Sequence, residues 1–317
     1  MAWICGIDEA GYGPNLGPFV MSAVVCSVPD AQADTCLWEL LKKAVRRGND
    51  WRDGRLVVDD SKVVHVGPRG LAGLEAGTFA VLGGLPEQLG LLVRNLCLEQ
   101  AKQLQGEAWF TGQTALPAAD KSDELLRQQQ QFADCCSQQG VTGWAVRSAI
   151  ICPPWFNTLI ERGGSKSAVL SEGFMQLLRW VEQHTSDGQS LTVFIDKQGG
   201  RNSYSGQIQQ ALDTGMVLAE QESLGCSRYR VEGRGRPIRL TFQPRADSAC
   251  FCVALASMVS KYLRELCMAE FNAFWSRHVP GLRATAGYPS DAPRFLEAIR
   301  PVAQQLQIPI EAIWRSR

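Results

Sequence analysis

Two adjacent carboxylates near the start of the chain have the types and spacing that most clearly suggest chemistry. Asp8 and Glu9 close a short apolar run at residues 3–7, and glycines follow at positions 11 and 13. Such a run closed by glycine is typical of a buried strand that meets a turn. A carboxylate there loses its hydration, so a nearby positive charge is expected to stabilise it. The leading candidate for that charge is a divalent metal ion.

Two more acids stand beside apolar segments. Asp196 follows the run 191–195, and Asp247 precedes a long apolar stretch. Because ligands gather beyond the strand ends of open α/β sheets, Asp8, Glu9 and Asp196 are expected to converge. Asp247 has helix capping as its alternative role, although Ser248 is also a good cap. The pattern alone also allows a solvated surface for the paired acids.

Oxygen ligands of this kind suit Mg²⁺ or Mn²⁺ rather than Zn²⁺. Two such ions can clamp the attacking water and the leaving oxygen of a phosphodiester. Only three histidines occur, and the cysteine pairs lack a matching second pair, which disfavours a zinc site. The acids are therefore candidates for metal-dependent hydrolysis, which their composition alone does not establish.

Strands and helices alternate along the chain and must position these acids. The patterns predict a mixed α/β layer fold with an inserted, glutamine-rich helical element at about 107–145 and a helical C-terminal portion at about 270–317. The expected strands are residues 3–7, 19–28, 56–58, 79–85 and 191–195, with a hairpin at 228–242. The expected helices are residues 35–47, 87–105, 172–184 and 248–275.

The composition of the 317-residue chain is that of a globular protein with a sizeable core, with 45% apolar and 20% charged residues. Lys plus Arg and Asp plus Glu balance at 32 each, so a polyanion must be held by local patches. The start does not resemble a signal peptide, and no run reaches the roughly 20 apolar residues of a membrane span. The 11 cysteines are interpreted as reduced core thiols, and the expected location is cytoplasmic.

Five segments resemble, in order, the motifs of one known family. The first runs from Gly6 through Asp8, Glu9 and the glycines to Val25, and it resembles the opening motif of the type 2 ribonucleases H, ribonucleases HII and HIII. The other four are Asp60-Ser61-Lys62, Phe194-Ile195-Asp196, Arg245-Ala246-Asp247 with the segment 256–265, and Gly287-Tyr288-Pro289-Ser290-Asp291. Together they cover roughly a third of the chain.

The resemblance implies a ribonuclease-H-like fold in a single domain of residues 1–317, with a central mixed five-stranded sheet flanked by helices. It implies that Asp8, Glu9, Asp196 and Asp247 are the catalytic, metal-binding acids, with Mg²⁺ or Mn²⁺ as cofactor. The implied activity is endonucleolytic hydrolysis of the RNA strand of RNA–DNA hybrids, leaving 3′-OH and 5′-phosphate ends. The chain is separately expected to be a monomer. Two alternatives stay open: a non-cleaving protein that binds hybrids or structured nucleic acid, and a metal-dependent nuclease for another substrate such as branched DNA.

The substrate-binding residues implied by the resemblance are Gly11, Tyr12, Gly13, Lys62 and Tyr288. Glycine N–H groups can approach a sugar-phosphate closely, although a plain tight turn is the alternative. Tyr288 matches a tyrosine that packs on the sugar at an RNA–DNA junction, where a 2′-OH contact distinguishes RNA from DNA. Ribonuclease HII usually has arginine where this chain has Tyr12, whereas ribonuclease HIII tends to have an uncharged residue, so cutting at single embedded ribonucleotides stays open.

One further feature comes from the residues alone. Six arginines lie close together along the predicted hairpin and just after it. They are placed either to contact the phosphates of a nucleic-acid backbone or, by their charge, to keep a solvated edge strand from pairing with another chain.

Overall fold

The computed structural model describes residues 1–48, 52–66, 69–97, 101–119, 123–185, 188–213 and 215–316. Within these ranges the main sheet has seven strands in the order β5-β2-β1-β6-β9-β8-β7. β1 is antiparallel to β2, β2 to β5, and β6 and β9 run parallel to β1. β8 and β7 continue the sheet in antiparallel fashion. The strands are β1 (Ala2–Ala10), β2 (Phe19–Val28), β5 (Thr142–Ile151), β6 (Ser190–Asp196), β7 (Met216–Glu222), β8 (Ser227–Glu232) and β9 (Ile238–Gln243).

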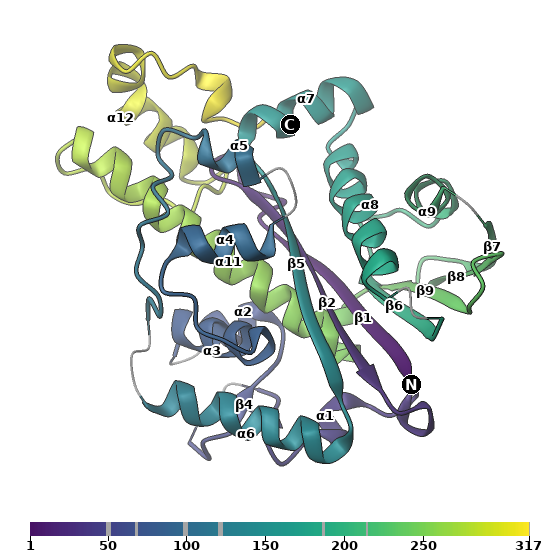
Figure 1. Cartoon of the computed structure of the whole chain (residues 1–317). Helices are drawn as coiled ribbons and strands as arrows, with labels where there is room; N and C mark the ends of the chain where they lie inside the picture. Colours follow the sequence, from purple (N-terminus) through teal and green to yellow (C-terminus); the bar gives the residue numbers. More distant parts are fainter. Residues whose placement is uncertain are drawn as a thin grey trace.

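Helices cover both faces of this sheet (Figure 1). The long α11 packs against β1 and β2 on one face, where α2 and α3 also lie, and α8 packs against the other. The helices of the described ranges are α1 (Leu37–Leu40), α2 (Ser61–Val66), α3 (Leu71–Leu82), α4 (Leu89–Leu96), α5 (Ala101–Gln105), α6 (Asp123–Gln139), α7 (Pro153–Gly163), α8 (Ser167–His184), α9 (Ser205–Leu212), α10 (Ala246–Ala249), α11 (Phe251–His278) and α12 (Ala292–Gln305). Strands β3 (Val45–Arg46) and β4 (Leu56–Val57) form a separate small parallel pair.

The alternation of side chains along β1 divides the core into two clusters. Ile4 belongs to the cluster on the α11 face, whereas Cys5 and Ile7 belong to the cluster on the α8 face. Gly6 marks the closest approach of α11 to the sheet, because a Cβ there would lie 2.1 Å from the backbone nitrogen of Val253. The beginning of α11 is therefore held directly over the middle of β1, and Ser260, further along the helix, donates to the Asp8 carbonyl at 3.0 Å.

The predicted mixed α/β fold with helices on both sides is confirmed, and the number of strands was wrong. The sheet has seven strands instead of five, because β8 and β7 extend it beyond β9. The prediction lacks β7, most of whose side chains are exposed, so no buried periodicity reveals it. It also lacks β5, which begins inside the segment 107–145. The hairpin at 228–242 is confirmed as β8 and β9.

Two predictions of local structure were wrong for physical reasons. Residues 79–85 were predicted as a strand, but most of them belong to helix α3, which is buried on nearly all sides between α11 and α6 and so lacks an amphipathic period. Residues 35–47 form only the short α1 before the chain turns into β3. The predicted long helix at 248–275 is present, interrupted at Cys250 between α10 and α11.

Helices also lie in two further segments. The segment 107–145 contains α6, which packs against α3, and the C-terminal portion contains α12. All 11 cysteines are free thiols, as interpreted from the sequence, and most are buried. Among the described residues, no helix combines the length and apolar character needed to cross a membrane.

Candidate active site

The register of β1 and β6 places two of the predicted acids at one edge of the sheet. The strands run parallel, and Ile7 lies opposite Ile195, so Asp8 and Asp196 follow at neighbouring positions. Ile7 and Ile195 both face the α8 cluster. Because side chains alternate along a strand, Asp8 and Asp196 therefore both project toward the α11 face.

Asp247 is brought to this edge by helix α10. The Ala246 N–H donates a hydrogen bond of 2.9 Å to Asp196 Oδ1, which fastens the start of α10 to the end of β6. The Asp247 carboxylate accepts the N–H of Ser248 at 2.8 Å. The N-cap positions of α10 and α11 are Arg245 and Cys250, and neither makes a side-chain capping bond. The alternative interpretation of Asp247 as a capping residue is therefore wrong.

Burial acts on all four acids, and repulsion from neighbouring carboxylates adds to it at Asp8, Glu9 and Asp247. Asp8 is 8% exposed, and burial raises its pKa well above the usual range, with repulsion from Glu9 and Asp196 adding to the effect. Burial, followed by repulsion from Asp196, raises the pKa of Glu9 to about 7. Burial likewise raises the pKa of Asp196 and of Asp247, and for Asp247 the charges of Asp60 and Asp196 contribute. Clustered carboxylates with raised pKa values are typical of functional sites.

These acids do not form a closed ligand set. Within the described ranges, no three His, Cys, Asp or Glu side chains are arranged to hold a metal ion. Glu9 follows Asp8 directly in β1, so its side chain starts from the opposite face of the sheet. The oxygen donors and their repulsion fit a divalent cation in chemistry, and Glu9 would have to reach around the end of β1 to join the others.

The predicted Lys62 lies beside the acids, at the start of α2. Its positive charge lowers the pKa of both Glu9 and Asp196, opposing the effect of burial. A hydrogen bond of 2.9 Å between the hydroxyls of Ser257 and Ser61 ties α2 to α11. Asp60, which acts on Asp247, is an acid at this edge that sequence reasoning placed in a motif but not in the site.

The predicted substrate-binding residues Gly11, Gly13 and Tyr288 come together in a second group. The Gly287 carbonyl accepts the Asn15 N–H at 2.7 Å, which joins the loop after β1 to the loop before α12. A Cβ at Gly13 would lie 3.8 Å from Tyr288 Cε1. The Tyr288 ring, in a residue that is 45% exposed, therefore faces the glycine loop, residues 11–18 between β1 and β2. The structure thus brings residues from the two ends of the chain to one surface.

Two buried arginines that sequence reasoning missed support this loop. Arg264 donates to the carbonyls of Leu16 and Ala286, at 3.4 and 3.0 Å. Arg315 donates to the carbonyls of Gly17 and Gly11, at 2.7 and 2.5 Å. An arginine inside the apolar helix α11 was the available signal for Arg264, whereas nothing in the C-terminal sequence distinguishes Arg315.

Tyr12 lies on the other face of the sheet. Its ring packs edge-on against Phe19, with centroids 6.4 Å apart, and the Lys166 ammonium stands 5.1 Å from its centroid. Burial raises the pKa of Tyr12, the charge of Glu9 adds to this and that of Arg201 opposes it. Tyr12 therefore lies between the cations Lys166 and Arg201 and the sheet edge that carries the four acids, which is named the acid edge.

Arginines of the predicted basic hairpin are engaged within the protein. Arg230 pairs with Glu232 and Glu220, and Arg234 pairs with Glu182 at 2.6 Å. The largely buried Arg236 donates to backbone carbonyls, including that of Glu182 at 3.1 Å. These contacts favour a structural role for these three arginines over contact with a nucleic-acid backbone.

Comparisons with known proteins give a structural similarity and no sequence match. No protein-family model matches the chain, and no curated protein matches it in sequence. In the PCNA complex of Archaeoglobus fulgidus ribonuclease HII, the enzyme aligns at a TM-score of 0.44 and 15% identity, over 99% of this chain and 94% of its own. Ribonuclease H2 from Pyrococcus horikoshii OT3 aligns at a TM-score of 0.44 and 13% identity, over 98% of this chain and 92% of its own.

A third solved structure, of Bst ribonuclease HIII in complex with Mn²⁺, aligns at a TM-score of 0.44 and 15% identity. The alignment covers 99% of this chain and 66% of that one. The three solved structures named here, each similar to this chain over nearly its whole length, are all type 2 ribonucleases H.

Proposed function

We propose that this protein is a metal-dependent endonuclease that hydrolyses the RNA strand of RNA–DNA hybrids. The observation that carries the proposal is the edge formed by β1, β6 and α10. Asp8 and Asp196 leave neighbouring parallel strands at one level, and the hydrogen bond from Ala246 to Asp196 fixes Asp247 beside them. Such a concentration of buried and half-buried acids needs a cation for all of them to stay ionised together.

In this proposal Asp8, Glu9, Asp196 and Asp247 hold Mg²⁺ or Mn²⁺. Bound ions of this kind supply an activated water and stabilise the leaving oxygen of an in-line displacement, which leaves 3′-OH and 5′-phosphate ends. Lys62 adds positive charge at the same edge. The loop of Gly11 and Gly13 offers backbone N–H groups to the sugar-phosphate, and the exposed ring of Tyr288 packs on the sugar.

Three duplexes test the proposal when offered to the purified chain with Mg²⁺ or Mn²⁺. They are a full RNA–DNA hybrid, a DNA duplex with one ribonucleotide, and plain DNA. We expect cleavage of the RNA strand in the full hybrid, and no cleavage of plain DNA. Binding of the hybrid without cutting would favour the non-cleaving alternative, and cleavage of plain or branched DNA would favour the other nuclease alternative. The second duplex shows whether a chain with Tyr12 cuts at a single ribonucleotide.

We further propose that the protein acts as a monomer in the cytoplasm. Light scattering coupled to size-exclusion chromatography tests the first statement, with a mass near the 34.8 kDa of one chain expected. A stable dimer would contradict it. Cell fractionation tests the location.

A further inference from the structure

A second polar surface lies on the α8 side of the sheet, away from the glycine loop. It is a groove of about 660 Å³ between the end of α7, the first turns of α8 and the segment that leads into α9. Its polar lining includes Arg162, Ser167, Ser171, Arg201 and Gln207. None of the motifs that define the proposed active site accounts for this surface.

The groove is connected to the acid edge through two tyrosines. Tyr204 lines it, and the Arg201 guanidinium carbon stands 6.0 Å from the centre of that ring. The charges of Asp196 and Glu9 both act on Tyr204, and the charges of Glu9 and Arg201 both act on Tyr12. The groove therefore starts near the face of the sheet from which Glu9 departs.

The cations of the groove are held by neutral partners. Arg201 donates to the hydroxyls of Ser171 and Ser167, at 3.0 and 3.2 Å. The exposed Arg162 has its guanidinium carbon 5.4 Å from the centre of the Trp155 ring. The acid in the lining, Glu172, accepts a hydrogen bond from Gln176 on its own helix. Hydroxyl and aromatic partners orient a guanidinium without neutralising its charge. The group therefore stays able to bind two phosphate oxygens with its paired N–H donors.

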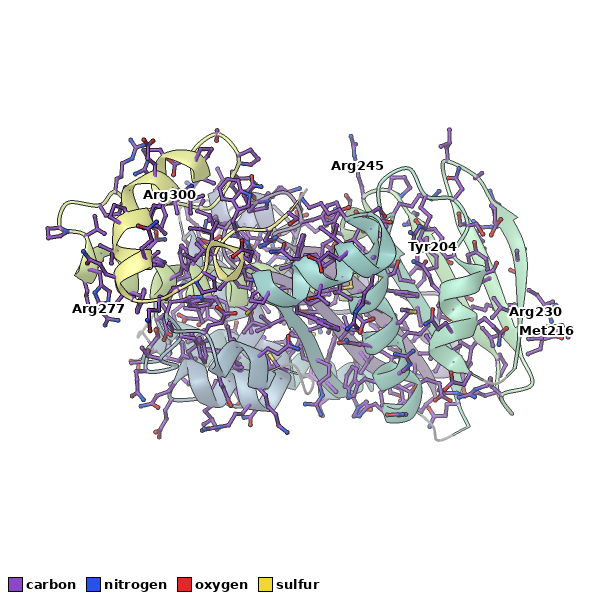
Figure 2. The ribbon with its side chains drawn as sticks, turned by 90° about the horizontal axis from the view of Figure 1, so that it is seen from above. Tyr204, Met216, Arg230, Arg245, Arg277 and Arg300 are labelled. Atoms are coloured by element: carbon purple, nitrogen blue, oxygen red, sulfur yellow. The ribbon has the colours of Figure 1, made fainter. Side chains whose placement is uncertain are left out.

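We propose that this groove is a backbone-phosphate subsite for nucleic acid, with Arg201 and Arg162 as its binding cations and Lys166 at the end next to Tyr12. The proposal rests on the proposed function for the class of substrate. A nucleic-acid strand that crosses the acid edge continues past Tyr12 into the groove, where one of its phosphates contacts the two arginines. Figure 2 shows Arg277 and Arg300 on the left of the molecule and Tyr204 to the right of its centre, so those two arginines provide distant controls.

Salt-dependent binding of an RNA–DNA hybrid tests the groove, measured with the full chain in the absence of divalent ions. Loss of one phosphate contact lowers the magnitude of the slope of log Kd against log salt by about 0.7–0.9. We expect this reduction for Arg201→Gln and for Arg162→Gln, with binding about 3–10-fold weaker near 0.1 M salt. Arg201→Lys should retain most of the slope, and Arg277→Gln should leave slope and Kd unchanged.

A variant of the serine partner separates charge from loop structure. Ser171→Ala removes one hydrogen bond of Arg201 but no charge, so its slope should equal that of the wild type. Unchanged slopes in both glutamine variants, or an equal loss in Arg277→Gln, would overturn the subsite even if the protein cuts hybrids. A protein that binds hybrid and shows the slope change without any cleavage would retain the subsite and lose the proposed function. A wild type that binds no hybrid would overturn both.

Discussion

At Asp8 the requirements of folding and of the proposed chemistry oppose each other. The carboxylate is buried, and Glu9 and Asp196 repel it, so ionised Asp8 destabilises the fold when no cation is bound. Its Oδ1 accepts the Glu9 N–H at 2.8 Å, a bond that an asparagine amide oxygen can also accept. We therefore expect Asp8→Asn to increase the free energy of unfolding at neutral pH by about 1–3 kcal/mol in metal-free buffer. Urea unfolding measures this, and a marked loss of stability would contradict the account.

Gly11 shows how a single backbone position limits the glycine loop. Its φ is +85°, and a Cβ would lie 2.3 Å from Arg264 Nε. Gly281 has a φ of +76° and nothing within 4 Å of its Cβ position, which makes it a matched control. Gly11→Ala should lower the free energy of unfolding by about 2–4 kcal/mol, whereas Gly281→Ala should lower it by about 1 kcal/mol from backbone strain alone. Equal losses in thermal unfolding would show that the close packing around Arg264 is unimportant.

At the scale of elements, the segment after α5 contains a titrating carboxyl. Burial raises the pKa of Glu107 to about 7, although the Trp109 indole N–H donates to it at 3.1 Å. The pKa of Glu107 is higher in the folded state than in the unfolded chain. The contribution of neutral Glu107 to stability is therefore complete below about pH 4.5 and is lost as the pH rises through about 7. Glu107→Gln should remove this loss and raise the free energy of unfolding at pH 8 by about 1–2 kcal/mol, after allowance for its partial exposure.

Denaturant unfolding at pH 4.5 and pH 8 provides the measurement for Glu107. The exposed Glu297→Gln on α12 is the control, for which we expect the same pH dependence as in the wild type. A Glu107→Gln protein whose stability still falls between these pH values as much as that of the wild type would contradict the assignment.

The elements that the sequence predicts correctly are those with a clear periodicity or a motif. The apolar runs before Asp8 and Asp196 both form strands, as predicted; β6 ends at Asp196, whereas β1 continues past Asp8 to Ala10. Helix α3 was not predicted, because its burial between α6 and α11 removes the pattern that identifies a surface helix. β7 was not predicted for the opposite reason, since its mostly exposed side chains carry no buried face.

Across the whole molecule, the ends of the chain are joined at the glycine loop. Leu16 and Trp314 form an isolated bridge, and Arg315 N–H donates to the Asn15 carbonyl at 2.8 Å. The Arg315 side chain is fully buried and donates to Gly11 and Gly17. Such contacts between distant segments have no local sequence signal, which explains why Arg315 and the support of the loop were not predicted. Glu9 is a different case, because its opposite direction follows from the local pleat of β1 and is not expressed by its motif.

This junction predicts a specific loss when Arg315 is changed. Arg315→Lys cannot reproduce two directed guanidinium bonds in a buried site, so the free energy of unfolding should fall by about 2–4 kcal/mol. Hybrid binding should weaken as well, because the loop that faces Tyr288 loses its support. Arg300→Lys on α12 is the control and should change neither quantity. Wild-type stability and binding in Arg315→Lys would contradict the structural role assigned to the junction.

The proposed role of Asp8 in metal-dependent cleavage is tested by the rate at which the wild type and Asp8→Asn cut the RNA strand of an RNA–DNA hybrid with Mg²⁺ or Mn²⁺. Glu265→Gln serves as the control, because Glu265 pairs with Lys261 at 2.6 Å on α11 and has no role among the proposed metal-binding acids. We expect the wild type and Glu265→Gln to cut the RNA strand, whereas the folded Asp8→Asn protein should show no cleavage above background. Cleavage by Asp8→Asn at the wild-type rate, or no cleavage by the wild type with either metal, would contradict this expectation.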